Sequence, residues 1–207
     1  MKPRQHMRRA LVALLGLGIL AGCLPKPRAF QAGPLEASRR IAILPLSNYS
    51  ADRDVPDKVR PMIASVLGQR PGIWLIDPGA VEAALAEEPW LLFDRIPPDL
   101  VDSLGTKLDA DALLVGAILG SGFRQEGPDQ VPHFSLSLRL LQTPGSRVLW
   151  SVVHSRDGDD GEWLFDFGRV HNLEQLIELT IEECLQTFPA TGVADTVSAV
   201  PAPGAQR

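Results

Sequence analysis

The sequence reads ALLVGAIL over residues 112–119, and this stretch decides the fold. A strand with one face in water alternates apolar and polar residues, whereas a strand that is covered on both faces is apolar throughout. Because no polar residue interrupts this run, it predicts a central strand that lies between two layers of the protein.

Strands and helices alternate upstream of this stretch. Residues 40–46 and 73–76 each contain a compact apolar run, which predicts a buried strand. Between them, apolar residues recur at the three-and-four spacing of one helix face, and we expect Pro61 in or near the first turn of that helix. Asp77 is placed to cap a further helix, and a short helix over residues 99–108 leads into the central strand.

The downstream pattern predicts an antiparallel hairpin. After a loop that contains glycine and proline, large apolar residues alternate with more polar ones over residues 134–141, as in a strand with one wetter face. Residues 143–146 read TPGS, which is strong turn chemistry, and residues 148–153 form the returning strand.

The clearest helix signal covers residues 173–188. Its apolar stripe is continuous, Asn172 can cap its first turn, and Cys184 lies on the apolar face, where we expect a small buried side chain. Four glutamates are expected to face water on the other side: Glu174, Glu178, Glu182 and Glu183.

This order of elements predicts an α/β fold. It is a single sandwich domain over residues 39–188, with a mixed sheet whose first strands are parallel and whose C-terminal strands form an antiparallel meander, flanked by helices. Residues 189–207 are rich in proline and alanine without periodicity, so we expect them to form a disordered tail.

The amino terminus carries an export signal. Four basic residues precede an apolar run over residues 10–20, which is too short to cross a bilayer comfortably: Lys2, Arg4, Arg8 and Arg9. The run ends in Leu20-Ala21-Gly22-Cys23, which resembles a bacterial lipobox. The resemblance implies that residues 1–22 are a lipoprotein signal peptide, cut between Gly22 and Cys23, and that Cys23 receives several acyl chains.

Two alternatives to the lipobox remain open, a plain secretory peptide and a signal anchor that is never cut. In the lipobox interpretation, residues 23–38 form a lipidated tether. Leu24 after the cysteine implies transfer to the outer membrane by analogy with other lipoproteins, with the domain facing the periplasm.

Charge and cysteine content limit the possible partners and crosslinks. The chain has a formal net charge of −5, and loss of the basic signal peptide makes the mature chain more acidic, so the sequence predicts no nucleic-acid partner. Lipidation of Cys23 leaves Cys184 as the last thiol, and no intramolecular disulfide is expected.

Residues 155–169 combine acidic and aromatic side chains outside any predicted element. We interpret this segment as the candidate interaction surface, because a mere connector has little need of three aromatic rings. The alternative is that the rings fold back over the sheet while the acids solvate the turn. The surface consists of Asp157, Asp159, Asp160, Glu162, Trp163, Phe165 and Phe167.

Motifs for metal binding and catalysis are weak. A calcium loop that begins at Asp157 would need a bidentate glutamate where the chain has Gly168, so we prefer a solvated turn. A hairpin that turns at residues 144–145 would bring His133 and His154 close together, but two imidazoles without a third ligand make a weak metal site. No nucleophile motif appears, so we predict no catalytic residue, no metal and no organic cofactor.

Several segments together resemble the envelope lipoproteins that have a TolB amino-terminal-like domain, a group that includes the curli-assembly lipoprotein. The resemblance rests on residues 41–48, 75–78, 104–105, 108–116 and 148–151. It implies a non-enzymatic module that assembles with itself or with envelope proteins. The chain departs from the curli type because it has no recognisable pair of long amphipathic pore strands, so we expect no secretion pore.

Two hypotheses from different classes follow. The first is a lipid-anchored, non-enzymatic binding or assembly module of the cell envelope, whose partners are the membrane, through its lipid, and envelope proteins or other copies of itself. The second is a surface-anchored hydrolase or metal-dependent enzyme with an unrecognised site. A convergent acid, base and nucleophile in a deep pocket would favour the second.

Overall fold

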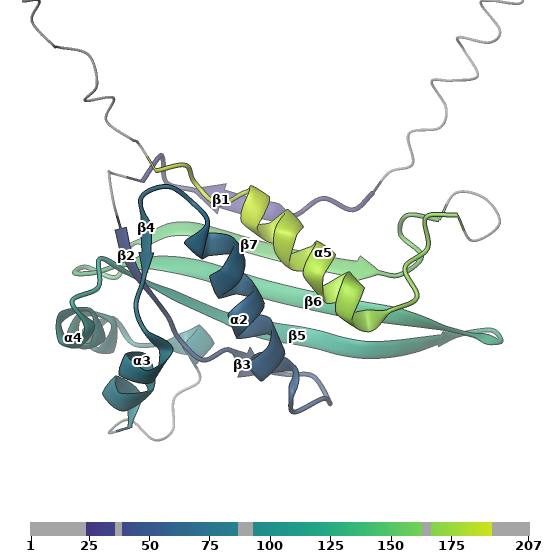
Figure 1. The fold of residues 1–207 in the computed structure, drawn as a ribbon, viewed down its shortest axis with the longest axis horizontal. Helices are drawn as coiled ribbons and strands as arrows, with labels where there is room; N and C mark the ends of the chain where they lie inside the picture. Colours follow the sequence, from purple (N-terminus) through teal and green to yellow (C-terminus); the bar gives the residue numbers. More distant parts are fainter. Residues whose placement is uncertain (1–23, 36–38, 87–92, 163–166, 192–207) are drawn as a thin grey trace, which may run out of the picture.

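A seven-stranded mixed sheet organises the protein (Figure 1). The computed structural model describes residues 24–35, 39–86, 93–162 and 167–191. The strand order is β1-β7-β6-β5-β2-β4, and β3 lies beside β5. The strands are β1 Arg28–Gln31, β2 Arg39–Ile43, β3 Ser47–Asn48, β4 Ile73–Leu75, β5 Ala112–Glu126, β6 Asp129–Gln142 and β7 Val148–Asp157.

The direction of the strands confirms the predicted mixed sheet. β2 runs parallel to both of its neighbours, with Ile41 opposite Leu75 of β4 and Ile43 opposite Leu114 of β5. β5, β6 and β7 then form an antiparallel meander. The fold is therefore α/β with a parallel beginning and an antiparallel end.

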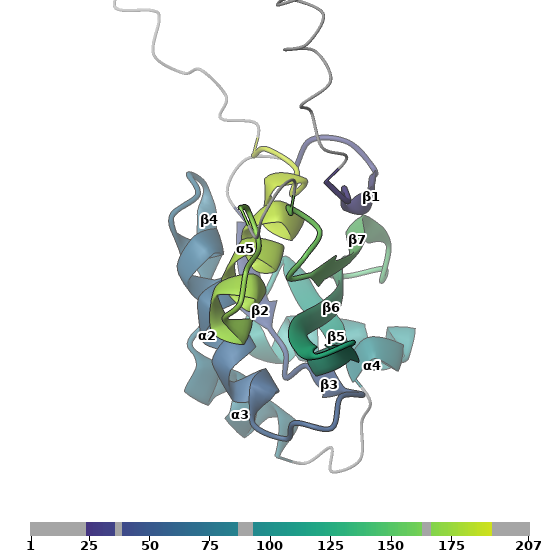
Figure 2. The same cartoon turned by 90° about the vertical axis from the view of Figure 1, so that its right-hand side faces the viewer.

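The central strand is apolar at every position of its first half because the sheet has a hydrophobic core on each face. Leu114 points into the core under α2 (Val55–Gly68) and α5 (Leu173–Gln186), whereas Leu113 and Val115 point into the core under α3 (Pro78–Leu85) and α4 (Pro98–Leu108). Seen edge-on, α2 and α5 lie on one side of the sheet and α4 on the other (Figure 2). The predicted two-sided burial is confirmed.

The helix caps expected from the sequence are present. The Asp77 carboxylate accepts a hydrogen bond from the backbone N–H of Ala80, at 3.0 Å, in the first turn of α3. Asn172 Oδ1 accepts from the backbone N–H groups of Glu174 and Gln175 at the start of α5.

In the described ranges, no helix is both long and apolar enough to cross a membrane.

β5 is longer than predicted. The prediction of a loop that contains glycine and proline after the central strand is wrong. β5 continues to Glu126, which pairs with Asp129 across a two-residue turn. A bulge between Ile118 and Gly120 shifts the register and lets pairing resume. Gly127, with φ of +60°, supplies the left-handed residue that the tight turn needs.

Pro61 lies inside α2 rather than in its first turn. The helix begins a turn and a half earlier, with Pro56 near its start, because Val55 and Val59 gain complete burial there. Proline in a helix interior removes one backbone hydrogen bond, a cost of about 3 kcal/mol. Burial of the extra apolar side chains offsets this cost.

Part of the segment expected to be a tether forms a strand. β1 pairs antiparallel with β7, with Arg28 opposite Val153 and Gln31 opposite Trp150. All four residues of β1 are exposed, so apolar periodicity gave no signal for it. Next to β1, Leu35 is buried and donates its backbone N–H to Ala190, which continues the fold to Thr191; residues 192–207 lie outside the described ranges.

Candidate functional site

The beginning of the described chain meets the segment that follows β7. Leu24 is the first described residue, and its Cδ2 would lie 3.6 Å from a Cβ placed on Gly161. Figure 1 shows that the chain enters β1 from the side of the molecule where the segment between β7 and α5 lies. Gly22 and Cys23, the predicted cleavage and lipidation residues, lie outside the described residues, directly before Leu24.

The acidic turn after β7 is tied to the β5–β6 hairpin. Arg124 NH1 donates to Asp157 Oδ2 at 2.8 Å, and Arg124 NH2 lies 3.6 Å from Asp159 Oδ2. The hydrogen bond to Asp157 raises the pKa of the Arg124 guanidinium. Asp160 Oδ2 accepts from the backbone N–H of Asp157 at 2.7 Å, which closes the turn.

The same turn is also tied to α5. Arg156, whose side chain is almost fully buried, lies with its Nε 3.4 Å from Asp160 Oδ2, and its NH1 donates to Glu183. His154 Nε2 is 2.6 Å from the other oxygen of Glu183. The expectation that Glu183 faces water is therefore wrong, because α5 packs on β7 and the alternation of β7 points His154 and Arg156 at it.

These ion pairs account for the acidic cluster. Carboxylate oxygens of Asp157, Asp159 and Asp160 can be chosen within 4.8 Å of one another, which is a spacing that a cation could bridge. Arg124 and Arg156 already supply positive charge to them. The cluster thus acts as a crosslink between the turn, the hairpin and α5.

The aromatic part of the candidate surface is described only at Phe167, which is 65% exposed. Trp163 and Phe165 lie outside the described residues. Glu162 is exposed, and its Oε2 is 3.8 Å from Arg169 NH1. Phe167 therefore faces outward. For this residue, the alternative that the aromatic rings fold back over the sheet is wrong.

The two histidines do not pair across the hairpin. The register of β6 and β7 places Leu136 opposite His154 and Asp157 opposite His133, with a shift between Leu140 and Leu141. His133 Nδ1 lies 3.3 Å from Asp157 Oδ1. The expectation of neighbouring imidazoles is wrong because this register shift was not visible in the turn sequence.

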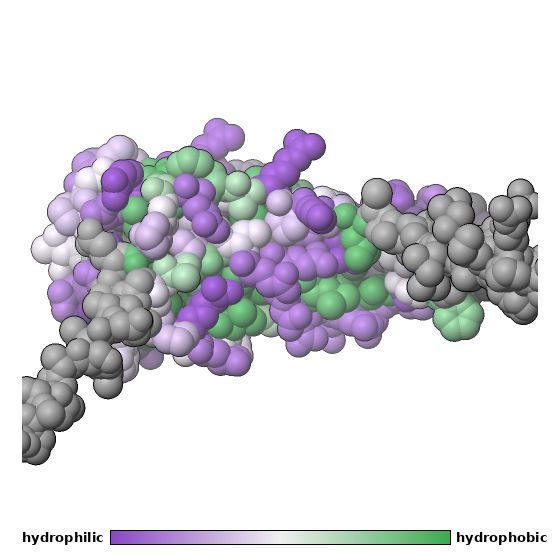
Figure 3. Space-filling model, turned by 90° about the horizontal axis from the view of Figure 1, so that it is seen from above, coloured by the Kyte–Doolittle hydropathy of each residue, from purple (hydrophilic) through white to green (hydrophobic). Residues whose placement is uncertain are grey.

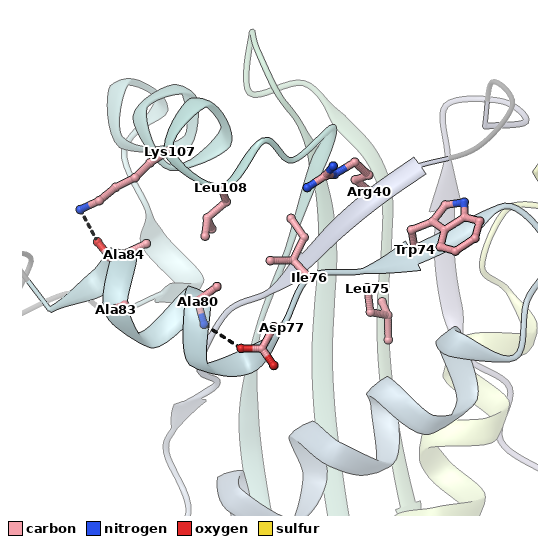
Figure 4. A pocket seen from close by; sticks show the side chains of 10 residues that line it. All are labelled: Arg40, Trp74, Leu75, Ile76, Asp77, Ala80, Ala83, Ala84, Lys107 and Leu108. Carbon is pink, nitrogen blue, oxygen red and sulfur yellow. Dashed lines mark hydrogen bonds between the residues drawn. The ribbon is translucent and has the colours of Figure 1, made fainter.

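An apolar groove of about 910 Å³ lies between α3 and α4 at the β4 edge of the sheet (Figure 4). Its polar residues have structural partners: Asp77 caps α3, Lys107 Nζ donates to the Ala84 carbonyl, and Arg40 NH1 is 2.9 Å from Asp109. None of its ten lining residues is a serine, cysteine or histidine.

A hydroxyl cluster beside β3 has a similar structural role. Ser47 Oγ and Tyr49 Oη both donate to the Asp94 carboxylate, at 2.8 and 3.0 Å. The hydrogen bond to Asp94 raises the pKa of Tyr49. These bonds hold the short 3-10 helix η1 (Phe93–Arg95) against the sheet.

Sequence reasoning missed the basic partners of the acidic turn. Arg124 lay in the stretch expected to be a loop, and Arg156 follows the end of the predicted returning strand. The alternation of β7 into residue 157 is the signal that could have extended the strand and placed Arg156 opposite α5.

The fold defined by these elements is one that bacterial lipoproteins also adopt. The chain is similar to lipoprotein GNA1162 from Neisseria meningitidis, with 18% identity and a TM-score of 0.53 over 72% of this chain and 99% of that chain. It is also similar to the PelC dodecamer from Paraburkholderia phytofirmans, with 18% identity and a TM-score of 0.53 over 80% of this chain and 97% of that chain.

At these identities the likeness shows the fold alone. No family model matches the chain, and no curated protein matches it. The resemblance to bacterial lipoproteins is thus supported at the level of the fold, whereas the TolB amino-terminal-like label is not confirmed and stays a prediction.

Proposed function

We propose that this chain is a lipid-anchored, non-enzymatic binding and assembly module of the bacterial cell envelope. In this proposal Cys23 carries the acyl chains, the outer membrane holds the protein, and the domain faces the periplasm. Its partners are envelope proteins or further copies of the same chain.

The observation that carries the proposal is the continuity between lipobox and domain. The residues that resemble a lipobox end at Cys23, Leu24 already lies beside Gly161, and 72% of the chain is similar in fold to lipoprotein GNA1162. A single acyl chain binds membranes only marginally, whereas several chains on one cysteine give lasting attachment. The resemblance to a lipobox and the likeness in fold to a lipoprotein together support an anchor on Cys23.

The engagement of the titratable side chains supports a non-enzymatic role. Asp157 is paired with Arg124, His154 with Glu183, and Asp77 with the first turn of α3. Catalysis needs an acid, base or nucleophile that is directed at a substrate site. These groups instead hold elements of the fold together.

The two edges of the sheet support a role in assembly. β1 and β4 are edge strands, and edge strands offer backbone hydrogen-bonding groups to another chain. Unlike surfaces that join head to tail build rings when the rotation closes. PelC, whose fold is similar, forms a dodecamer.

Metabolic labelling with a fatty acid tests the anchor. We expect label on the wild-type protein and none on Cys23→Ser, which should accumulate as an unprocessed or mislocalised precursor. Cys184→Ala is the matched control, because Cys184 is buried in the domain, and it should keep the label. Equal labelling of wild type and Cys23→Ser would sink the assignment.

Crosslinking in intact cells, followed by identification of the captured proteins, tests the partners. We expect crosslinks to envelope proteins or between copies of this chain. The mass of the lipidated protein in mild detergent separates these two outcomes, because self-association gives a multiple of the mass of one chain. A monomer that captures no envelope protein would contradict the assembly role.

A further inference from the structure

The chain passes from the predicted anchor into the fold without a long spacer. Leu24 already lies beside Gly161, and β1 begins at Arg28. Extended chain spans at most about 3.6 Å per residue, so the start of β1 lies within about 18 Å of Cys23. A lipidated Cys23 therefore brings this edge of the sheet close to the bilayer.

Three exposed apolar side chains belong to the segment that follows the predicted anchor and to the segment that follows β7. The exposed fractions are 50% for Leu24, 55% for Phe30 and 65% for Phe167. Leu24 lies beside Gly161, and Gly161 lies beside the carbonyl oxygen of Gly168. Because Phe167 directly precedes Gly168 in the chain, it belongs to the same corner of the molecule. Seen from the side of β1, hydrophobic patches lie between hydrophilic side chains (Figure 3).

Two cations lie in the same segment. Lys26 and Arg28 are exposed, and neither has an ion-pair partner within the part of the chain that the structure describes. The nearby acids Asp157 and Asp159 are already paired with Arg124. Lys26 and Arg28 are therefore basic groups of this segment that remain available to a partner.

We propose that the occupant of this surface is the lipid bilayer itself. The anchor face consists of Leu24, Lys26, Arg28, Phe30 and Phe167. Its apolar side chains enter the headgroup region, and its two cations contact the phosphates of anionic lipids. The inference rests on the proposed function, because the acyl chains of Cys23 bring the face to the membrane.

The combination of residues favours lipid over a protein partner. Aromatic and leucine side chains flanked by lysine or arginine are the composition of elements that lie in a membrane interface. Bilayer is also the material that an acyl-bearing Cys23 holds next to Leu24, so a protein partner would have to displace it. The proposal thereby gives Phe167, one of the predicted interaction residues, a defined partner.

Quenching of a fluorescent label by a nitroxide lipid tests the proposal on the full-length lipidated protein. The chain is reconstituted in vesicles of phosphatidylethanolamine and phosphatidylglycerol, with a nitroxide on the upper acyl chain of some lipids. Bimane is attached to Phe30→Cys or Phe167→Cys. The controls match them in exposure, Phe123→Cys on β5 at 55% and Trp74→Cys on the opposite edge strand at 66%. Burial keeps the native thiol of Cys184 from reacting.

We expect the nitroxide lipid to remove most of the fluorescence at Phe30→Cys and Phe167→Cys and to leave both controls at the level of aqueous bimane. Vesicles that float with the protein while all four labels stay unquenched would overturn the anchor face and leave the lipid anchor standing. Equal quenching of all four labels would also overturn it. Protein that fails to float with the vesicles would remove the anchor and the face together.

A charge reversal tests the contribution of the two cations with the same quenching measurement. Lys26→Glu combined with Arg28→Glu should lower the quenching at Phe30→Cys in vesicles that contain phosphatidylglycerol. The control is Arg53→Glu, an exposed reversal before α2, which should leave quenching unchanged. If the double reversal leaves the quenching at Phe30→Cys unchanged, the lipid assignment is wrong. It is also wrong if, in intact cells, the labels at Phe30 and Phe167 are shielded only by a crosslinked protein.

Discussion

His154 on β7 and Glu183 on α5 are joined by a hydrogen bond of 2.6 Å between Nε2 and Oε2. The other oxygen of Glu183 accepts from Arg156, so one carboxylate holds two buried side chains of the sheet. This contact fixes the last helix to the strand that leads into the acidic turn. It is the point where the core of the domain and the candidate surface are connected.

Glu183→Gln should destabilise the domain, because it leaves the buried Arg156 without its nearest full negative charge. Loss of one partner from a buried ion pair costs about 3–5 kcal/mol, and we expect the lower end because a quarter of Glu183 is exposed. Urea denaturation measures the effect. Glu182→Gln, an exposed neighbour on the same helix, should change the free energy of unfolding by less than about 0.5 kcal/mol. Equal effects of the two changes would argue against the contact.

Cys184 should be unreactive in the folded protein. Burial, with a smaller contribution from the charge of Glu183, raises the pKa of the thiol to about 12. Because the thiolate is the reactive form, maleimide at neutral pH should label Cys184 only after denaturation. Labelling at equal rates with and without denaturant would show that the thiol is accessible.

The raised pKa of Cys184 also predicts a pH dependence of stability. Between the ordinary thiol value near 9 and about 12, the unfolded chain loses the thiol proton while the folded chain keeps it. Stability is therefore unaffected below pH 9 and falls above it, by up to about 1.4 kcal/mol per pH unit from this group. The difference between wild type and Cys184→Ala in alkaline urea denaturation isolates this contribution, and parallel pH profiles would contradict it.

Asp159 and Asp160 should differ in their contribution to stability. Asp160 closes the turn through the backbone N–H of Asp157 and also faces the buried Arg156, so Asp160→Ala should cost about 1–3 kcal/mol. Asp159 makes only a longer contact with Arg124, and Asp159→Ala should stay within about 0.5 kcal/mol of wild type. Thermal melts of both variants compare them. Identical melting temperatures would mean that the turn is not held by Asp160.

Phe188 should be essential to the end of the fold. Its ring packs edge-on against Trp150, with centroids 5.0 Å apart, and both rings are buried. Phe188→Ala should therefore cost about 3–5 kcal/mol. Deletion of residues 192–207 is the control and should leave the melting temperature nearly unchanged. A deletion that destabilised as much as Phe188→Ala would show that the tail is part of the folded unit.

Local sequence patterns determined the elements that are specified by their own side chains or by residues a few positions away. The run over residues 112–119 is apolar at every position because successive side chains enter two different cores, and such a run has few other solutions. Asp77 and Asn172 cap their helices through atoms only a few residues away. The hydrophobic stripe that buries Cys184 is equally local.

Only the tertiary structure decided the features that depend on a distant partner. All four residues of β1 are exposed, and the strand forms because β7 offers a row of backbone hydrogen-bonding groups. The side chains of β1 therefore carry no pattern that predicts a strand. Glu183 looked like a solvent-facing glutamate until β7 placed His154 and Arg156 beside it. The candidate surface follows the same rule. Its acidic residues were visible in the sequence. The pairing of Arg124 with Asp157 and the closeness of Leu24 to Gly161 join chain segments more than 30 residues apart, which only folding brings together.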